Sequence, residues 1–137
     1  MVEVDHLVPD PDRDVPGPLL VWEDDRLAMV DCVADLLRAL SPASVSTGGV
    51  VVHDAHGNRV LLRIERARYR RLRLWRAVRE RVVVTGKDPA PGHADRVAHR
   101  LAGWLERQGE ARARELPLGE LVRRAALLAP WKARGKR

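Results

Sequence analysis

The most regular hydrophobic pattern of the chain lies in its first third, where apolar residues recur at three- and four-residue steps. These positions are Leu27, Val30, Ala34, Leu37 and Leu40. Such spacing is typical of one face of an amphipathic helix. The acidic residues 23–25 lie where the positive end of the helix dipole favours them, and Ser41-Pro42 ends the pattern. The sequence therefore predicts a helix over about residues 24–40.

Two runs rich in β-branched residues follow, at residues 49–54 and 59–64, on either side of Ala55-His-Gly-Asn58. Gly and Asn tolerate the positive φ that tight hairpin turns require. The second run alternates apolar and mostly basic positions, as does a strand with two different faces. We therefore expect a β-hairpin.

The next stretch, residues 63–81, holds nine arginines and two glutamates, a local net charge of +7. At about 100° per residue, its apolar positions share one side of a helix: Ala67, Leu74, Trp75, Val78 and Val82. Most of the arginines lie on the other side, with Tyr69 beside them. The pattern favours a helix with a basic outer face, followed by a short buried strand at residues 82–85.

Two more amphipathic patterns predict helices at about residues 94–108 and 118–128. Leu19-Leu-Val-Trp22 is a short apolar run that we interpret as a strand. The resulting order over residues 19–85 is β-α-β-β-α-β, that of the ferredoxin-like split motif. We therefore predict an α+β fold, a small antiparallel sheet with two additional C-terminal helices.

A chain of 137 residues suits one domain. Four prolines interrupt the acidic start, so we expect residues 1–18 to form an extended acidic arm. Residues 19–130 then form a single α+β domain, and residues 131–137 a basic tail. The single cysteine, Cys32, fits a reducing compartment, and no apolar run reaches the roughly 18 residues of a membrane span. A cytoplasmic protein is expected.

Charge is divided unevenly along the chain. Residues 1–40 carry ten acids and three bases, a net charge of −7, while the other 97 residues carry 22 bases and nine acids, a net charge of +13. These parts attract each other, within one molecule or between two. Arginine outnumbers lysine by 22 to 3, which also fits coding by a GC-rich genome, so composition alone does not identify a binding surface.

Catalytic and metal-binding patterns are weak. His53, Asp54 and His56 form the one tight polar cluster, whose residue types suit a first-row metal. Strand alternation places the first two on opposite faces, and a polar turn explains the same residues without a metal. The acidic triplet at residues 10, 12 and 14 lacks the Gly and Glu of a calcium-binding EF-hand loop. There is no phosphate loop or nucleophile elbow. We expect a non-catalytic protein without a cofactor.

Three segments resemble response-regulator receiver domains: the acidic pair after a strand in Leu19-Leu-Val-Trp-Glu-Asp-Asp-Arg-Leu27, Val82-Val-Val-Thr85, and Leu116-Pro-Leu-Gly-Glu-Leu-Val122. The resemblance implies a parallel sheet and Asp54 as the phosphoacceptor. The chain departs from the family at Leu116, where a lysine is expected, and at Asp54, which precedes a hairpin turn. A degenerate receiver domain is therefore the less favoured alternative.

Binding to an anionic partner is the function that the sequence favours. Nucleic-acid interfaces use arginine and lysine at phosphates and aromatic side chains for stacking. The predicted surface comprises Arg59, Arg63, Arg66, Tyr69, Arg70, Arg73 and Arg76, with the tail residues Lys132, Arg134, Lys136 and Arg137. DNA or RNA is the most concrete partner. A protein-interaction or assembly role, including self-association of the acidic arm with the basic body, is the alternative.

Overall fold

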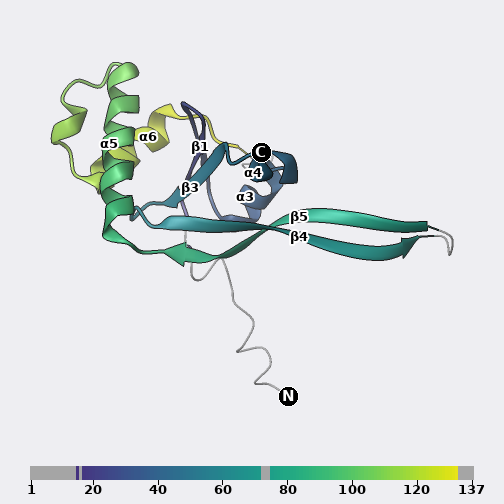
Figure 1. Cartoon of the computed structure of the whole chain (residues 1–137). Coiled ribbons are helices and arrows are strands. Elements are labelled where there is room, and N and C mark those ends of the chain that lie inside the picture. Colours follow the sequence, from purple (N-terminus) through teal and green to yellow (C-terminus); the bar gives the residue numbers. More distant parts are fainter. Residues whose placement is uncertain (1–14, 16, 72–74, 133–137) are drawn as a thin grey trace.

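The computed structural model describes residue 15, residues 17–71 and residues 75–132, with the backbone alone for 67–71 and 75–78. Its described residues form a five-stranded antiparallel sheet in the order β2-β1-β3-β4-β5 (Figure 1). The strands are β1 (Leu19–Glu23), β2 (Arg26–Val30), β3 (Val50–Asp54), β4 (Arg59–Arg71) and β5 (Trp75–Asp88). The helices are α3 (Val33–Ala39), α4 (Pro42–Ser46), α5 (Pro91–Arg107) and α6 (Leu118–Leu128), with a 3₁₀ turn η1 (Ala113–Glu115).

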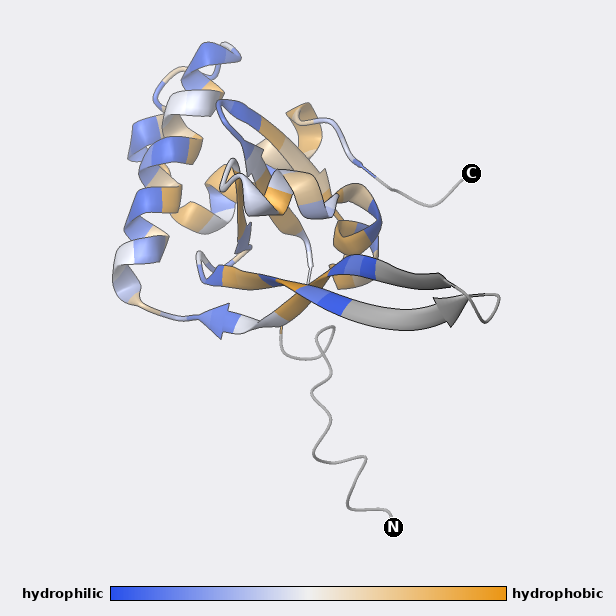
Figure 2. Ribbon diagram, turned by 45° about the vertical axis from the view of Figure 1, so that its right-hand side comes forward, coloured by the Kyte–Doolittle hydropathy of each residue, from blue (hydrophilic) through white to orange (hydrophobic). Residues whose placement is uncertain are grey.

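Side chains alternate between the two faces of the sheet along each strand. Each face carries apolar residues, and helices cover both faces. On one face, Leu20 and Met29 pack with Leu101 and Leu105 of α5. On the other face, Leu19 and Val21 of β1 pack with α3. In Figure 2, α5 shows hydrophilic and hydrophobic positions in turn along its length, as an amphipathic helix does. The domain is thus a sheet between two helical layers.

The predicted helix over residues 24–40 is wrong in its first half. Residues 19–30 form a hairpin in which Glu23 lies opposite Arg26, and Asp24 occupies the turn with a φ of 55°. Aspartate tolerates this left-handed conformation better than most residues. The acidic residues that suggested a helix start therefore make the turn of a hairpin. Helix begins only at Val33.

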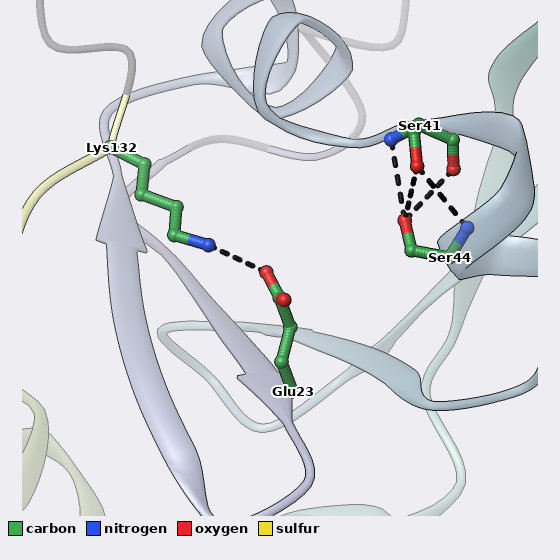
Figure 3. Close-up of polar contacts among 4 residues, drawn as sticks. All are labelled: Glu23, Ser41, Ser44 and Lys132. Atoms are coloured by element: carbon green, nitrogen blue, oxygen red, sulfur yellow. Dashed lines mark hydrogen bonds and ion pairs between the residues drawn. The ribbon is translucent and has the colours of Figure 1, made fainter.

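A second short helix follows α3 at once. Ser41 caps α4: its hydroxyl accepts a hydrogen bond from the Ser44 backbone N–H at 3.2 Å, and Ser44 reciprocates by accepting from the Ser41 N–H at 3.3 Å (Figure 3). This capping box satisfies two backbone donors at a helix start. Pro42, expected to end one helix, is the first residue of another.

The predicted helix over the arginine-rich residues 63–81 is also wrong. These residues form most of β4 and β5, two long strands paired from Arg59↔Asp88 to Arg71↔Trp75. Ion pairs across the two strands place each glutamate beside an arginine of the other strand, an arrangement that a helix of the same residues lacks. The hairpin at residues 49–64 is confirmed, and its second strand continues far beyond the predicted end.

The C-terminal helices are confirmed, with α5 beginning three residues earlier than predicted. After α6 the chain returns to the sheet, where Lys132 donates its backbone N–H to the Met29 carbonyl at 2.9 Å. The α+β class and the antiparallel sheet are confirmed. The ferredoxin-like order is not, because two strands precede α3 and no helix separates β4 from β5. The sheet is not the parallel sheet of a receiver domain.

Candidate nucleic-acid interface

Strands β4 and β5 form a two-stranded ribbon that extends away from the rest of the domain (Figure 1). Among the described residues, β3 pairs with β4 only at His53↔Arg59, whereas β4 pairs with β5 along its whole length. From Glu65↔Arg81 to Arg71↔Trp75 the ribbon spans about 20 Å at about 3.4 Å per residue. We call residues 65–81 the ribbon arm.

The base of this ribbon is fixed in the core. Val60 and Val82 are buried in the cluster that includes α3, and Leu62 and Val84 pack against it. An irregularity in the pairing lies between Leu61 and Leu62, opposite Gly86 and Val84, so that Thr85 is the extra residue of β5. Such a bulge increases local twist and turns a strand. The arm therefore starts from a rigid base.

Both acidic residues of the arm pair with arginines near its base. Glu65 accepts hydrogen bonds from Arg81 (Oε1 to Nη2, 2.5 Å) and lies 3.6 Å from Arg63. The hydrogen bond from Arg81 lowers the pKa of Glu65 below its ordinary value. On the other side of the ribbon, Arg66 pairs with Glu80 at 3.4 Å. The charges at the base are thus largely balanced.

Beyond this point the balance ends. Residues 67–79 contain six arginines and no acidic residue: Arg68, Arg70, Arg71, Arg73, Arg76 and Arg79. The register places Arg70 directly opposite Arg76. Like charges at directly opposed positions destabilise a sheet. The outer part of the arm therefore concentrates positive charge that the arm itself does not neutralise.

The structure divides the predicted binding surface among three places. Arg63 and Arg66 lie exposed near the base of the arm, and Tyr69, Arg70 and Arg76 belong to its strands. Arg59 lies at a pocket beside α5. Lys132 lies at the opposite edge of the sheet, where its Nζ contacts Glu23 Oε1 at 2.6 Å (Figure 3). Arg73, Arg134, Lys136 and Arg137 lie outside the described residues.

All five acids of the predicted arm, residues 1–18, lie outside the described residues. Val15, which belongs to that segment, is buried in the core beside β1. Two later acids of the first forty residues form ion pairs away from the ribbon arm. Asp35 pairs with Arg38 at 3.0 Å, and Glu23 pairs with Lys132. These two carboxylates thus neutralise charges of the body rather than of the ribbon arm.

The polar cluster at residues 53–56 serves the β3–β4 turn. Asp54 is fully buried and accepts hydrogen bonds from the His56 and Asn58 backbone N–H groups, both at 2.9 Å, and from the Asn58 side-chain amide at 2.8 Å. His56 is exposed, whereas His53 is buried. No group of three metal-ligating side chains converges within the described residues. Asp54 therefore uses its oxygens to hold the turn.

The sequence pattern missed a basic pocket between β3 and α5. Its volume is about 130 Å³, and its lining includes His53, His93, Arg59, Arg96 and Arg100. The rings of the two histidines lie 6.4 Å apart. Burial, with the charges of Arg59, His93 and Arg100, lowers the pKa of His53 to about 4. These residues lie up to 47 positions apart in the chain, so no local sequence motif predicts the pocket.

Two side chains of this pocket are held by neighbours. His93 Nε2 lies 2.9 Å from Asp88 Oδ2, and this hydrogen bond lowers the pKa of Asp88. Arg100 lies over the ring of Trp22, with its guanidinium carbon 4.4 Å from the ring centroid, and it donates to the Asp24 carbonyl. The pocket therefore has fixed walls.

Comparison with known protein families, with characterised proteins and with solved structures found no match for this chain. None of the helices in the described part of the chain is long and apolar enough to cross a bilayer.

Proposed function

We propose that the protein binds nucleic acid through the ribbon arm. The observation that carries the proposal is the opposition of Arg70 and Arg76 in an acid-free segment of a projecting ribbon. A dense polyanion relieves this repulsion, because each phosphate that meets an arginine releases a condensed counterion. The free protein therefore holds a charge arrangement that becomes favourable on a phosphate backbone.

The shape of the arm supports the same function. The major groove of B-DNA is about 12 Å wide and admits a two-stranded β-ribbon. The arm projects about 20 Å from its base, which suffices to reach into a groove while the body stays outside. Tyr69 and Trp75 belong to the same ribbon, and such residues stack on unpaired bases. Duplex DNA is the first substrate to test, with single strands as the comparison.

The test compares two triple variants of equal charge. Arg66→Gln, Arg70→Gln and Arg73→Gln remove three positive charges from the arm. The control, Arg107→Gln, Arg112→Gln and Arg123→Gln, removes three exposed arginines on or near α5 and α6. Fluorescence anisotropy with a labelled random duplex at low salt measures affinity. The arm variant loses binding, and the control variant retains most of it. Equal loss in both would mean that net charge alone attracts the duplex, and it would overturn the proposal.

The edge of β5 favours a second candidate function. Among the described residues, β5 pairs only with β4, so its outer edge is open to an added strand. Its exposed arginines Arg79 and Arg81 favour an acidic extended segment, such as residues 1–14 of another copy. This assembly function predicts an oligomer that high salt disperses. Size-exclusion chromatography of a variant lacking residues 1–14 tests it, and a full-length monomer at every salt concentration would contradict it.

A further inference from the structure

The pocket between β3 and α5 gathers three arginines and two histidines from three elements. Arg59 comes from the start of β4, His53 from the end of β3, and His93, Arg96 and Arg100 from α5. Val51 and Val97 complete the lining. No carboxylate belongs to this lining. The composition is that of a site for an anion, since a guanidinium donates several N–H bonds in a geometry that matches phosphate oxygens.

Two of these side chains are held from outside the pocket, which keeps the walls in place. Asp88 holds His93 through its ring Nε2, and the Asp24 carbonyl accepts one N–H of Arg100. A guanidinium has five N–H donors, so Arg100 keeps others for a second acceptor. Arg96 is exposed and has no acidic partner at salt-bridge distance among the described residues.

His53 supplies the second, independent observation. Its side chain is only 6% exposed, and its Nδ1 is a buried atom with no hydrogen-bond partner among the described residues. Buried polar atoms in folded proteins almost always have a partner. His53 therefore lines the pocket without a carboxylate or carbonyl partner of its own for Nδ1 among the described residues.

The size of the pocket limits that group. A volume of about 130 Å³ corresponds to about four water molecules at about 30 Å³ each. This admits one tetrahedral oxyanion with a water or two, and the pocket is open to solvent on one side. An attached sugar would have to lie outside the pocket.

We propose that this pocket binds a phosphate group, either inorganic phosphate or the terminal phosphate of a phosphomonoester, through Arg59, Arg96 and Arg100. His53 and His93 line the phosphate, and Asp88 fixes the ring of His93. The site is separate from the ribbon arm and does not require that the arm bind nucleic acid.

Titration of the full chain with inorganic phosphate tests the proposal, with sodium chloride at matched ionic strength as the salt control. Isothermal titration calorimetry gives saturable binding in the millimolar range or tighter. The ring resonances of His53 and His93 in ¹H–¹³C spectra shift with the same saturation. The variant Arg96→Gln weakens binding about tenfold or more, since a hydrogen bond to a charged group is worth that much. Arg123→Gln, which removes an exposed arginine of α6 outside the pocket, leaves phosphate affinity unchanged.

A second titration identifies the source of the phosphate. Thymidine 5′-monophosphate binds with an affinity that depends on Arg96, and thymidine does not bind. Binding of inorganic phosphate without binding of thymidine 5′-monophosphate would rule out a phosphomonoester as the ligand and would leave inorganic phosphate as the ligand. Absence of saturable phosphate binding up to about 10 mM, about ten times a Kd of 1 mM, would overturn the site itself. Equal weakening by Arg123→Gln and Arg96→Gln would do the same, because it would show a general effect of net charge.

Discussion

Arg70 and Arg76 occupy directly opposed positions in the register of β4 and β5. Opposed like charges weaken a free ribbon, yet nearby Glu65 and Glu80 each lie beside an arginine. The contrast separates a ribbon base whose glutamates are paired with arginines from an outer segment whose arginines, under the proposed function, contact phosphates. This contrast makes stability and binding change in opposite directions on mutation.

The double variant Arg70→Gln and Arg76→Gln tests that opposition. Removing the repulsion stabilises the free protein by about 0.2–1 kcal/mol, while the loss of two arginines weakens duplex binding. Urea denaturation and anisotropy measure the two quantities on the same preparations. The control, Arg107→Gln with Arg123→Gln, removes the same charge without an opposed pair. A double variant that is less stable than the wild type would contradict the account.

Glu65 offers the converse change. The variant Glu65→Gln releases Arg63 and Arg81 from their shared carboxylate. The groups are exposed, and exposed ion pairs add little stability, so unfolding changes little. The net charge of the ribbon rises by one, and duplex affinity increases, with a steeper dependence on salt. Glu115→Gln, which alters an exposed ion pair with Arg112 in the loop before α6, leaves affinity near that of the wild type. A Glu65→Gln variant with wild-type affinity would show that the base of the arm does not reach the nucleic acid.

His53 makes stability depend on pH. Its pKa falls from an ordinary value of 6.5 to about 4 on folding, mainly through burial. The unfolded chain therefore binds this proton more readily than the folded one. Stability is fully present above pH 6.5 and falls as the pH drops toward 4, by at most about 1.4 kcal/mol per pH unit. Glu65 and Asp88, whose pKa values are lowered in the folded protein, affect stability mainly at lower pH.

Urea denaturation at pH 7, 6 and 5 measures this dependence. In His53→Gln the drop between pH 7 and pH 5 is smaller than in the wild type, whatever the stability of the variant at pH 7. The control, His56→Gln, changes an exposed histidine in the β3–β4 turn and keeps the wild-type dependence of stability on pH. Parallel curves for the wild type and His53→Gln would show that His53 titrates normally in the folded protein.

Gly57 couples the β3–β4 turn to α5. Its φ is +86°, and a Cβ there would lie 2.6 Å from the Cα of Ala94. Gly57→Ala therefore combines an unfavourable backbone conformation with a backbone clash, and we expect a loss of at least about 1–3 kcal/mol. Gly119→Ala in α6, where an added Cβ meets open space, stabilises by up to about 1 kcal/mol. Thermal denaturation of both variants checks the pair; a harmless Gly57→Ala would mean that the turn and α5 move apart easily.

The sequence predicted those elements whose signals are local. The turn at residues 55–58 contains a glycine that the positive φ requires, and the amphipathic patterns of α5 and α6 each have one dominant period. The helix prediction failed at residues 24–30 because the apolar positions there fit two patterns. Leu27 and Val30 fit one face of a helix, and Leu27 and Met29 equally fit one face of a strand. Only pairing with β1, seen as Trp22↔Leu27 and Leu20↔Met29, decides between them.

The arginine-rich stretch misled for a different reason. Beyond Ile64, arginines stand at both even- and odd-numbered positions of β4, so the alternation of apolar and polar residues that indicates a strand ends there. The deciding contacts join residues 14 and 16 positions apart, Arg66 with Glu80 and Glu65 with Arg81. The pocket beside α5 depends on residues still farther apart in the chain, since Arg59 and Arg100 line the same pocket only because α5 packs against the sheet.

The dependence of duplex affinity on salt tests the central claim most directly. Each phosphate contact contributes about 0.9 to the slope of log affinity against log salt concentration. The wild type shows a steep slope, and Arg66→Gln with Arg70→Gln and Arg73→Gln lowers it by about three units, while the triple control at Arg107, Arg112 and Arg123 leaves it nearly unchanged. A slope that is shallow in the wild type, or one that the arm variant and the control reduce equally, would contradict binding through the ribbon arm.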